Sequence, residues 1–221
     1  MGGITEQAGC AKAACGAMAI KTRGEKDVIL AAMADALEKN SQHIIEANRT
    51  DLYNAEQSGM SVNMVDRLML NEARIKDIAD GLRSIISLED PIGITDKMWT
   101  RSNGLRIGIR RVPLGVVGII YEARPNVTAD AIGLCIKSGN ACILRGGKEA
   151  ISSNMAIVDT MVVAGIKAGL PDGAVQLVRD TSRETATKMM QLIGFIDVLI
   201  PRGGAGLIKS VVESAKVPVI E

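Results

Sequence analysis

Residues 113–128, Pro113-Leu114-Gly115-Val116-Val117-Gly118-Ile119-Ile120-Tyr121-Glu122-Ala123-Arg124-Pro125-Asn126-Val127-Thr128, decide the fold that we expect for this chain of 221 residues. The stretch passes from an apolar run into a short polar loop and then into a helical pattern. Such a run is typical of a strand buried on both faces of a parallel sheet. Four further apolar runs, separated by helical stretches, follow at 141–144, 175–178, 198–200 and 217–220. The sequence therefore predicts an α/β fold with a doubly wound, mostly parallel sheet of five strands.

The residues before this sheet have a different pattern. Residues 1–94 predict a layer of helices, with apolar positions at helical spacing in 8–21, 22–37, 41–57 and 71–88. Thr22 and Glu25 have the spacing of a capping box at the start of the second helix. Residues 95–112 contain Asn103-Gly104, the strongest short signal for a β-hairpin. We expect this hairpin to project as an arm and to pair with another subunit, because two strands alone are marginally stable.

Composition excludes several functional classes. The net charge is +1, so no global positive field draws the chain to nucleic acid, and 2% aromatic residues are too few for a base-stacking platform. One histidine, His43, excludes a multi-histidine metal site, and we expect no metal. No apolar run reaches the length of about 18 residues that a membrane span needs. Four cysteines without a secretory signal favour a reduced, cytoplasmic setting.

The loops at the carboxyl ends of the predicted strands are the places where a ligand would bind in such a sheet. They are rich in arginine, and two of them add a Gly-Gly pair; the loops are residues 121–126, 145–149, 179–182 and 201–206. This pattern suits an anionic ligand with several phosphates, because glycines and helix N-termini let phosphate approach backbone N–H groups. Neither a complete G-x-G-x-x-G nor a Walker A motif is present, so an inert α/β domain is the alternative. For Asn126 alone, an ordinary helix N-cap is the simpler interpretation.

None of the four cysteines has the surroundings of an activated nucleophile. Cys10 and Cys15 are five residues apart and fall on different faces of a helix. Cys135 lies in an apolar helical stretch, and Cys142 lies inside a strand run. We expect these thiols to act as small hydrophobic side chains.

Residues 112–128 closely resemble the γ-glutamyl phosphate reductase (glutamate-5-semialdehyde dehydrogenase) family of the aldehyde dehydrogenase superfamily. The resemblance covers essentially the whole chain and is carried further by Ser138-Gly139-Asn140-Ala141, by Leu144-Arg145-Gly146-Gly147-Lys148-Glu149-Ala150 and by Asp197-Val198-Leu199-Ile200-Pro201-Arg202-Gly203-Gly204. It implies that residues 1–221 are the N-terminal cofactor-binding domain, with a helical layer at 1–94, the arm at 95–112 and a Rossmann-like part at 113–221. The domain with the catalytic cysteine of the family would lie outside this chain.

The resemblance implies a reaction. Members of the family reduce L-glutamyl 5-phosphate with NADPH to L-glutamate 5-semialdehyde and phosphate, in the second step of proline biosynthesis, through a cysteine thioester. The implied partners are this substrate, further copies of the chain through the arm, and glutamate 5-kinase. We expect residues 1–221 alone to be inactive. Two alternatives stay open: a dinucleotide-binding module without catalysis, and an acylating aldehyde dehydrogenase for another substrate.

The resemblance also implies a set of cofactor-binding residues. They are Arg124, Arg145, Lys148, Gly203 and Gly204. Gly203 and Gly204 match the turn that approaches the pyrophosphate, and Arg145 matches a lysine on the adenosine ribose. Lys148 stands where members that prefer NAD have a glutamate, which indicates NADP(H) as the cofactor.

Two further positions follow from the same resemblance, and a third follows from the predicted helix beside Lys148. Asn126 matches the asparagine that donates to the oxyanion. Glu221 matches a glutamate that acts as a base in thioester hydrolysis, a role that a reductase does not need. Residues 152–153 fall in the first turns of a predicted helix, whose N-terminus would add N–H donors for a 2′-phosphate beside Lys148.

Overall fold

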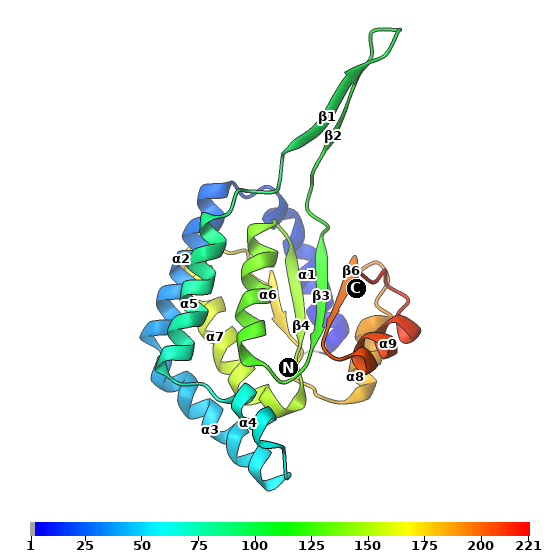
Figure 1. The fold of residues 1–221 in the computed structure, drawn as a ribbon. Helices are drawn as coiled ribbons and strands as arrows, with labels where there is room; N and C mark the ends of the chain where they lie inside the picture. Colours follow the sequence, from blue (N-terminus) through cyan, green and yellow to red (C-terminus); the bar gives the residue numbers. More distant parts are fainter. Residues whose placement is uncertain (1–2) are drawn as a thin grey trace.

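A computed structural model describes residues 3–221 (Figure 1). The first strand predicted from the sequence lies in the interior of the parallel sheet. This strand, β3 (Val116–Tyr121), pairs in parallel with β4 (Ala141–Arg145) on one side and with β6 (Val198–Arg202) on the other. β5 (Val175–Leu177) pairs in parallel with β4, which gives the order β5-β4-β3-β6. The doubly wound α/β fold expected from the sequence is therefore confirmed.

The sheet has four strands, and the fifth run of the prediction is reduced to a single bridge. Val219 forms a parallel bridge with Leu199, with Leu199 N–H donating to Pro218 O at 2.8 Å and Ile220 N–H donating to Leu199 O at 2.9 Å. Pro218 has no N–H to donate, which shortens the ladder that this segment can form. The run lies beside β6, at the edge of the sheet.

Helices cover both faces of the sheet because side chains of β3 alternate between two apolar cores. Val117 and Ile119 pack into the larger core with α2, α5, α6 and α7, whereas Val116 and Ile120 pack into the other core with α1, α8 and α9. The helices concerned are α1 (Ile4–Ala19), α2 (Arg23–Lys39), α5 (Glu72–Ser87), α6 (Pro125–Lys137), α7 (Ile151–Lys167), α8 (Arg183–Met190) and α9 (Ala205–Ser214). All six residues of β3 are buried, as its uninterrupted apolar run predicts.

The N-terminal helices agree with the sequence pattern, with one addition. Thr22 and Glu25 form the predicted capping box, in which Glu25 N–H donates to Thr22 Oγ1 and Thr22 N–H donates to Glu25 Oε2. The third predicted helix is present as α3 (Ser41–Gln57). The addition is α4 (Val62–Leu68), a seven-residue helix that the sequence analysis missed. Its side chains form part of the site described below.

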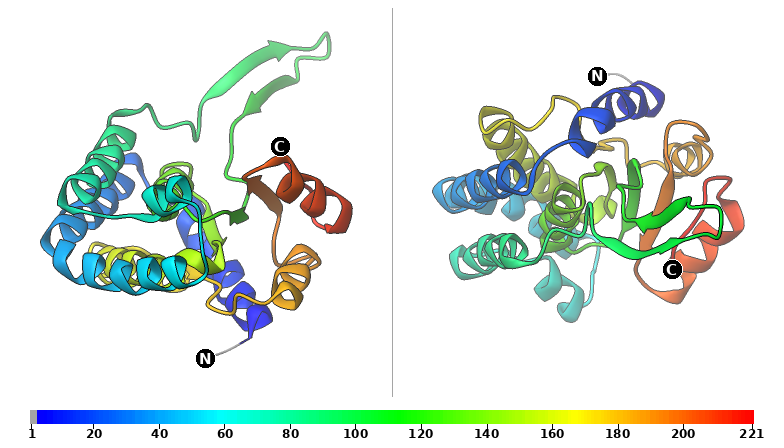
Figure 2. Two further views of the ribbon diagram at one scale, coloured as in Figure 1. Left: turned by 60° about the horizontal axis from the view of Figure 1, so that its bottom comes forward. Right: turned by 90° about the horizontal axis from the view of Figure 1, so that it is seen from above.

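The predicted arm is present and extends away from the sheet (Figure 2, left). Its strands, β1 (Thr95–Thr100) and β2 (Arg106–Arg110), pair antiparallel with Trp99 opposite Ile107. Gly104, in the connecting turn, has a φ of 84°, a conformation that favours glycine. Most side chains of the arm are exposed.

One helix of the core is apolar along most of its length. Residues 148–167 are long and apolar enough, by length and composition alone, to cross a membrane, with a mean hydropathy of 1.2. In the structure, α7 packs against α2, α3 and α6, and its apolar residues contribute to the larger core. This packing accounts for the composition of the helix.

Two buried polar residues of α3 hold neighbouring elements in place. The Asp51 carboxylate accepts hydrogen bonds from Ser152 N–H at 3.1 Å, from Ser153 N–H at 2.7 Å and from the Ser153 hydroxyl at 2.6 Å. Asn48, one turn earlier, accepts from Leu70 N–H at 2.8 Å and donates to Leu68 O at 2.9 Å. Asp51 therefore caps the N-terminus of α7, and Asn48 fixes the end of α4.

We expect Asp51→Ala to destabilise the fold by about 2–4 kcal/mol. The substitution leaves the buried Ser153 N–H and hydroxyl and the half-buried Ser152 N–H without their acceptor, and an unsatisfied buried donor costs its full desolvation penalty. Urea denaturation at neutral pH measures the change. Glu56→Ala, at an exposed position of the same helix, is the control and should change stability by less than about 0.5 kcal/mol. Equal stability of the two variants would contradict this role of Asp51.

Candidate active site

The carboxyl edge of the sheet has its crevice between β3 and β6. The helix after β3, α6, packs on one face, whereas the helix after β6, α9, packs on the other. Adjacent strands whose connections leave toward opposite faces create a gap at the carboxyl ends, where open α/β sheets bind ligands. The loops at 121–124 and 202–204 meet at this point.

A pocket of about 700 Å³ lies at this edge, and we refer to it as the cationic pocket. Five of its lining residues are positively charged, namely Arg67, Arg124, Arg145, Lys148 and Arg183, and two are negatively charged, namely Glu122 and Glu149. The excess of positive charge is local, because the whole chain carries a net charge of only +1. Arg124, Arg145 and Lys148, which the sequence analysis predicted as cofactor-binding residues, are thus brought together.

Arg145 is held partly inside the protein. It donates from Nη2 to Thr181 O at 2.9 Å and forms no ion pair with the described residues. Its Nε is buried and has no hydrogen-bond partner in the described residues. A buried donor without a partner is costly, and a ligand oxygen would satisfy it. Lys148, by contrast, is exposed at the start of a short 3-10 helix, Lys148–Ala150.

The glycine turn after β6 already holds an anionic group. Gly204 N–H, at the N-terminus of α9, donates to Glu122 Oε1 at 2.9 Å. A Cβ at Gly203 would lie 2.7 Å from the Glu122 carboxyl carbon, so only glycine allows this approach. The Glu122 carboxylate therefore stands where a phosphate oxygen would meet the helix N-terminus. Gly203 and Gly204 do not line the cationic pocket directly but adjoin it through Glu122.

A buried chain of polar groups supports the floor of this pocket. The Tyr121 hydroxyl lies 2.7 Å from Thr128 Oγ1, which in turn donates to Asn154 Oδ1 at 2.8 Å. Because Thr128 donates its one hydroxyl hydrogen to Asn154, the Tyr121 hydroxyl donates to Thr128, and burial raises the pKa of the Tyr121 phenol far above its usual value. Gly146 has to be glycine, because a Cβ there would lie 2.3 Å from Asn154 Nδ2. These hydrogen bonds link β3 to α6 and α7, and the Gly146 backbone lies close to Tyr121 and Asn154.

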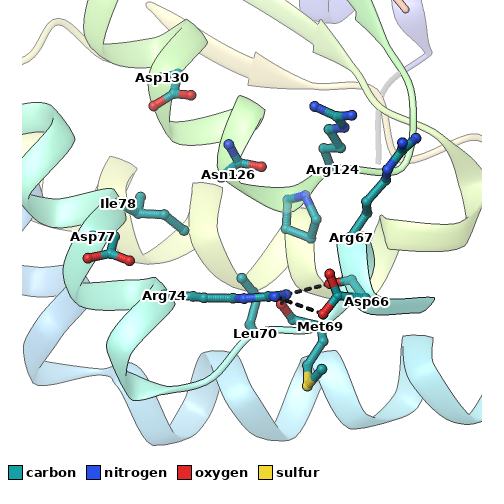
Figure 3. Close-up of a pocket in the computed structure, with 11 residues that line it drawn as sticks. Asp66, Arg67, Met69, Leu70, Arg74, Asp77, Ile78, Arg124, Asn126 and Asp130 are labelled. Atoms are coloured by element: carbon teal, nitrogen blue, oxygen red, sulfur yellow. Dashed lines mark hydrogen bonds and ion pairs between the residues drawn. The ribbon is translucent and has the colours of Figure 1, made fainter. Parts of the chain in front are cut away.

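A second pocket, of about 390 Å³, lies between the α4–α5 segment and the start of α6 (Figure 3). We refer to it as the mixed-charge pocket, because arginine, aspartate and asparagine side chains line it; the charged and amide residues are Asp66, Arg67, Arg74, Asp77, Arg124, Asn126 and Asp130. Arg67 and Arg124 line both pockets, so the two are adjacent. Asn126 belongs to this second pocket and not to the cationic pocket.

The structure overturns the interpretation of Asn126 as an N-cap. The N-cap of α6 is Arg124, Pro125 is the first helical residue, and Asn126 follows it in the first turn. The Asn126 side chain is exposed to the pocket and forms no hydrogen bond with the described residues. Its amide is therefore available as a donor, which is what the resemblance implies for this position.

Some charged groups of the mixed-charge pocket form ion pairs and others do not. Arg74 donates from Nη1 to Met69 O at 2.8 Å and from Nη2 to Asp66 Oδ1 at 2.8 Å, so these two side chains neutralise each other (Figure 3). Asp77 and Asp130 form no ion pair within residues 3–221. Burial raises the pKa of Asp130, and the charge of Arg202 opposes this shift only in part.

The expected helix N-terminus beside Lys148 is not free. The N–H groups of Ser152 and Ser153 donate to Asp51, and Ser153 is fully buried. The expectation that this N-terminus adds donors for a 2′-phosphate is therefore wrong, because a carboxylate from α3 already occupies it. The Lys148 and Arg145 side chains are the cations that this loop offers. Glu221 lines neither pocket.

The cysteines lie away from both pockets. Cys135 and Cys142 are buried, and the neighbouring Cys135 thiol together with burial raises the pKa of Cys142 well above its usual value. Cys10 is exposed and Cys15 is half-buried, and neither lines the cationic or the mixed-charge pocket.

Several residues of the site were not found from the sequence. Arg67 comes from α4, a helix too short to give a periodic signal. Glu122 was only part of the quoted loop, although its position directly after a buried strand marks it as a residue at the sheet edge. Asp77 lies on α5, and the sequence analysis considered only the apolar positions of this helix. Ser61, the N-cap of α4, is the only local sign of that helix.

Comparisons with known proteins agree with this architecture. The sequence model of the aldehyde dehydrogenase family matches residues 4–216. The chain is 56% identical over 218 residues to a gamma-glutamyl phosphate reductase of Clostridium novyi (strain NT), a match that covers 99% of this chain and 52% of the relative. The chain spans about half the length of the curated relatives that it matches.

Solved structures of proteins with the same name are similar to this chain in fold. The gamma-glutamyl phosphate reductase of Thermotoga maritima superposes with a TM-score of 0.96 at 39% identity, covering 98% of this chain and 52% of that chain. The enzyme of the same name from Saccharomyces cerevisiae superposes with a TM-score of 0.88 at 31% identity, covering 100% of this chain and 56% of that chain.

We expect Glu122→Gln to bind inorganic pyrophosphate about fivefold more tightly than the wild type does. The neutral amide can still accept from Gly204 N–H but no longer repels an anion at this helix end, a charge effect of about 1 kcal/mol at an exposed site. Isothermal titration calorimetry measures the affinity. Glu213→Gln, which removes the same charge from the far end of α9, is the control and should not change it. Unchanged or weaker pyrophosphate binding by Glu122→Gln would show that the turn is not an anion site.

Proposed function

This chain belongs to the aldehyde dehydrogenase family, and we propose that residues 1–221 form the dinucleotide-binding domain of an NADPH-dependent enzyme. The enzyme would reduce L-glutamyl 5-phosphate to L-glutamate 5-semialdehyde and phosphate, the reductive step that leads to proline. The relatives named gamma-glutamyl phosphate reductase support this substrate. The observation that carries the proposal is the cationic pocket at the carboxyl edge of the sheet, where the protein concentrates positive charge.

The residues of this pocket suit a dinucleotide. Its five cations can neutralise phosphate groups, and the unpartnered Nε of Arg145 provides a buried donor for a ligand oxygen. Gly203 and Gly204 allow the backbone at the N-terminus of α9 to approach a pyrophosphate once Glu122 moves aside. When bound, the nicotinamide supplies the hydride.

The protein's own groups then position the substrate. Arg67 and Arg124 border both pockets, so they can hold an acyl phosphate at the boundary between cofactor and substrate. The Asn126 amide is free to donate to an oxygen that gains negative charge during the reaction. None of the four cysteines lines these pockets, so in this proposal the thiolate nucleophile lies outside residues 1–221, and these residues alone would not turn over substrate.

The remaining features fit the same proposal. The arm β1–β2 would pair with a second copy of the chain, because its strands are exposed and too few to be stable alone. Glutamate 5-kinase would be a further partner, as the enzyme whose product is the acyl phosphate. The setting would be the cytoplasm, consistent with four free cysteines.

We expect the chain to bind NADPH more tightly than NADH, and Lys148→Glu to abolish or reverse this preference. Lys148 lies on the cationic pocket, and its ammonium can donate to a 2′-phosphate, whereas a glutamate repels that group. A charge-assisted hydrogen bond contributes about 1.5–3 kcal/mol, so its loss should weaken NADPH binding about ten- to a hundredfold. Titration of both cofactors against both proteins measures the ratio.

The matched control is Lys167→Glu, an equal change of charge at the far, exposed end of α7. It should leave the ratio of NADPH to NADH affinity as in the wild type. A ratio that is the same in Lys148→Glu and in the wild type would refute the assignment of Lys148. Failure of the wild type to bind either cofactor would refute the proposed domain function.

A further inference from the structure

We infer that the mixed-charge pocket binds the α-amino-acid end of the substrate, with the Asp77 and Asp130 carboxylates accepting the α-ammonium group. This inference rests on the proposed function, because it takes the glutamyl group as the ligand. It adds a binding site and two specificity-determining residues on α5 and α6, outside the cationic pocket.

The first argument is the presence of two carboxylates that form no ion pair with the described residues, although the charge of Arg202 acts on Asp130 from a longer distance. Asp66 is paired with Arg74, but Asp77 and Asp130 form no ion pair or hydrogen bond within residues 3–221. Both line the same pocket, from the facing helices α5 and α6 (Figure 3). Asp130 is half-buried, and a charged group withdrawn from water without a partner is costly unless a ligand supplies one.

The second argument is the order of the groups along α6. Arg124 caps the helix, Asn126 follows in the first turn, and Asp130 lies four residues after Asn126 on the same face. This places Asp130 about 6 Å further along the helix axis than Asn126. The pocket is therefore cationic and hydrogen-bond-donating at one end and acidic at the other. A glutamyl phosphate has its acyl phosphate at one end and, at the other, the α-carbon that carries both the ammonium and the α-carboxylate, so its ammonium can meet the acidic end of the pocket.

The third argument concerns the kind of cation that the acidic end would accept. Among residues 3–221, no group of three or more His, Cys, Asp or Glu side chains is placed to hold a metal ion. Two carboxylates beside the apolar side chain of Ile78 suit an organic ammonium, which needs hydrogen-bond acceptors but no full coordination shell. The Arg67 and Arg124 guanidinium groups complete the pocket at its other end as binding groups for the acyl phosphate.

The test compares two probes that differ only in the amino group. L-Glutamate and glutarate are titrated into the isotope-labelled chain, and amide chemical shifts report both affinity and location. For the wild type we expect L-glutamate to bind about five- to tenfold more tightly than glutarate, with shifts at Asn126, Asp130 and the neighbouring Gly81. In Asp130→Asn and in Asp77→Asn the preference should fall to less than about twofold, because glutarate binding loses nothing.

Both substitutions are isosteric, and Glu213→Gln is the control for the loss of one negative charge. Equal affinities for the two probes in the wild type, no L-glutamate binding, or a preference that survives in both Asn variants would overturn the inference. The cofactor titrations are read separately. Dinucleotide binding without the amino-group preference would refute this site alone. The preference without dinucleotide binding would refute the proposed function and leave the amino-acid site in place.

Discussion

The burial of β3 on both faces is the constraint on which the rest of the structure depends. All six of its residues are apolar or enclosed, and its neighbours β4 and β6 satisfy its backbone on both sides. Polar side chains can therefore follow this strand only after Tyr121, at the carboxyl edge of the sheet. Because the following helix packs on one face while α9 packs on the other, the polar residues that emerge there face an open crevice.

Positive and negative side chains are distributed unequally between the two pockets at this edge of the sheet. The cationic pocket holds most of the positive charge, whereas the unpaired carboxylates lie on α5 and α6 in the adjacent pocket. Arg67 and Arg124 stand between the two. Two carboxylates, Glu122 and Glu149, also line the cationic pocket, and Glu122 occupies the N-terminus of α9. The Glu122 carboxylate accepts from the exposed Gly204 N–H and so stabilises the turn at this helix end.

Local signals predicted most of the fold, and long-range contacts account for what they missed. The capping box at Thr22, the turn at Asn103-Gly104 and the apolar runs depend on residues close in sequence, so they could be read directly. The role of Asp51 could not, because its partners Ser152 and Ser153 lie about a hundred residues away. The predicted cations Arg124, Arg145 and Lys148 do line one pocket, because the carboxyl ends of parallel strands lie at the same edge of the sheet. Arg67 was missed because it comes from α4, a helix too short to show a periodic pattern.

The central claim is that the turn at Gly203-Gly204 and the loop after β4 hold a phosphate-bearing dinucleotide. A crystal structure of the chain with NADP⁺ tests it most directly. The account predicts the pyrophosphate over Gly203 and Gly204, the Glu122 carboxylate turned away from Gly204 N–H, and the 2′-phosphate beside Lys148. A dinucleotide bound elsewhere, or one bound while Glu122 keeps its hydrogen bond to Gly204, would contradict the account.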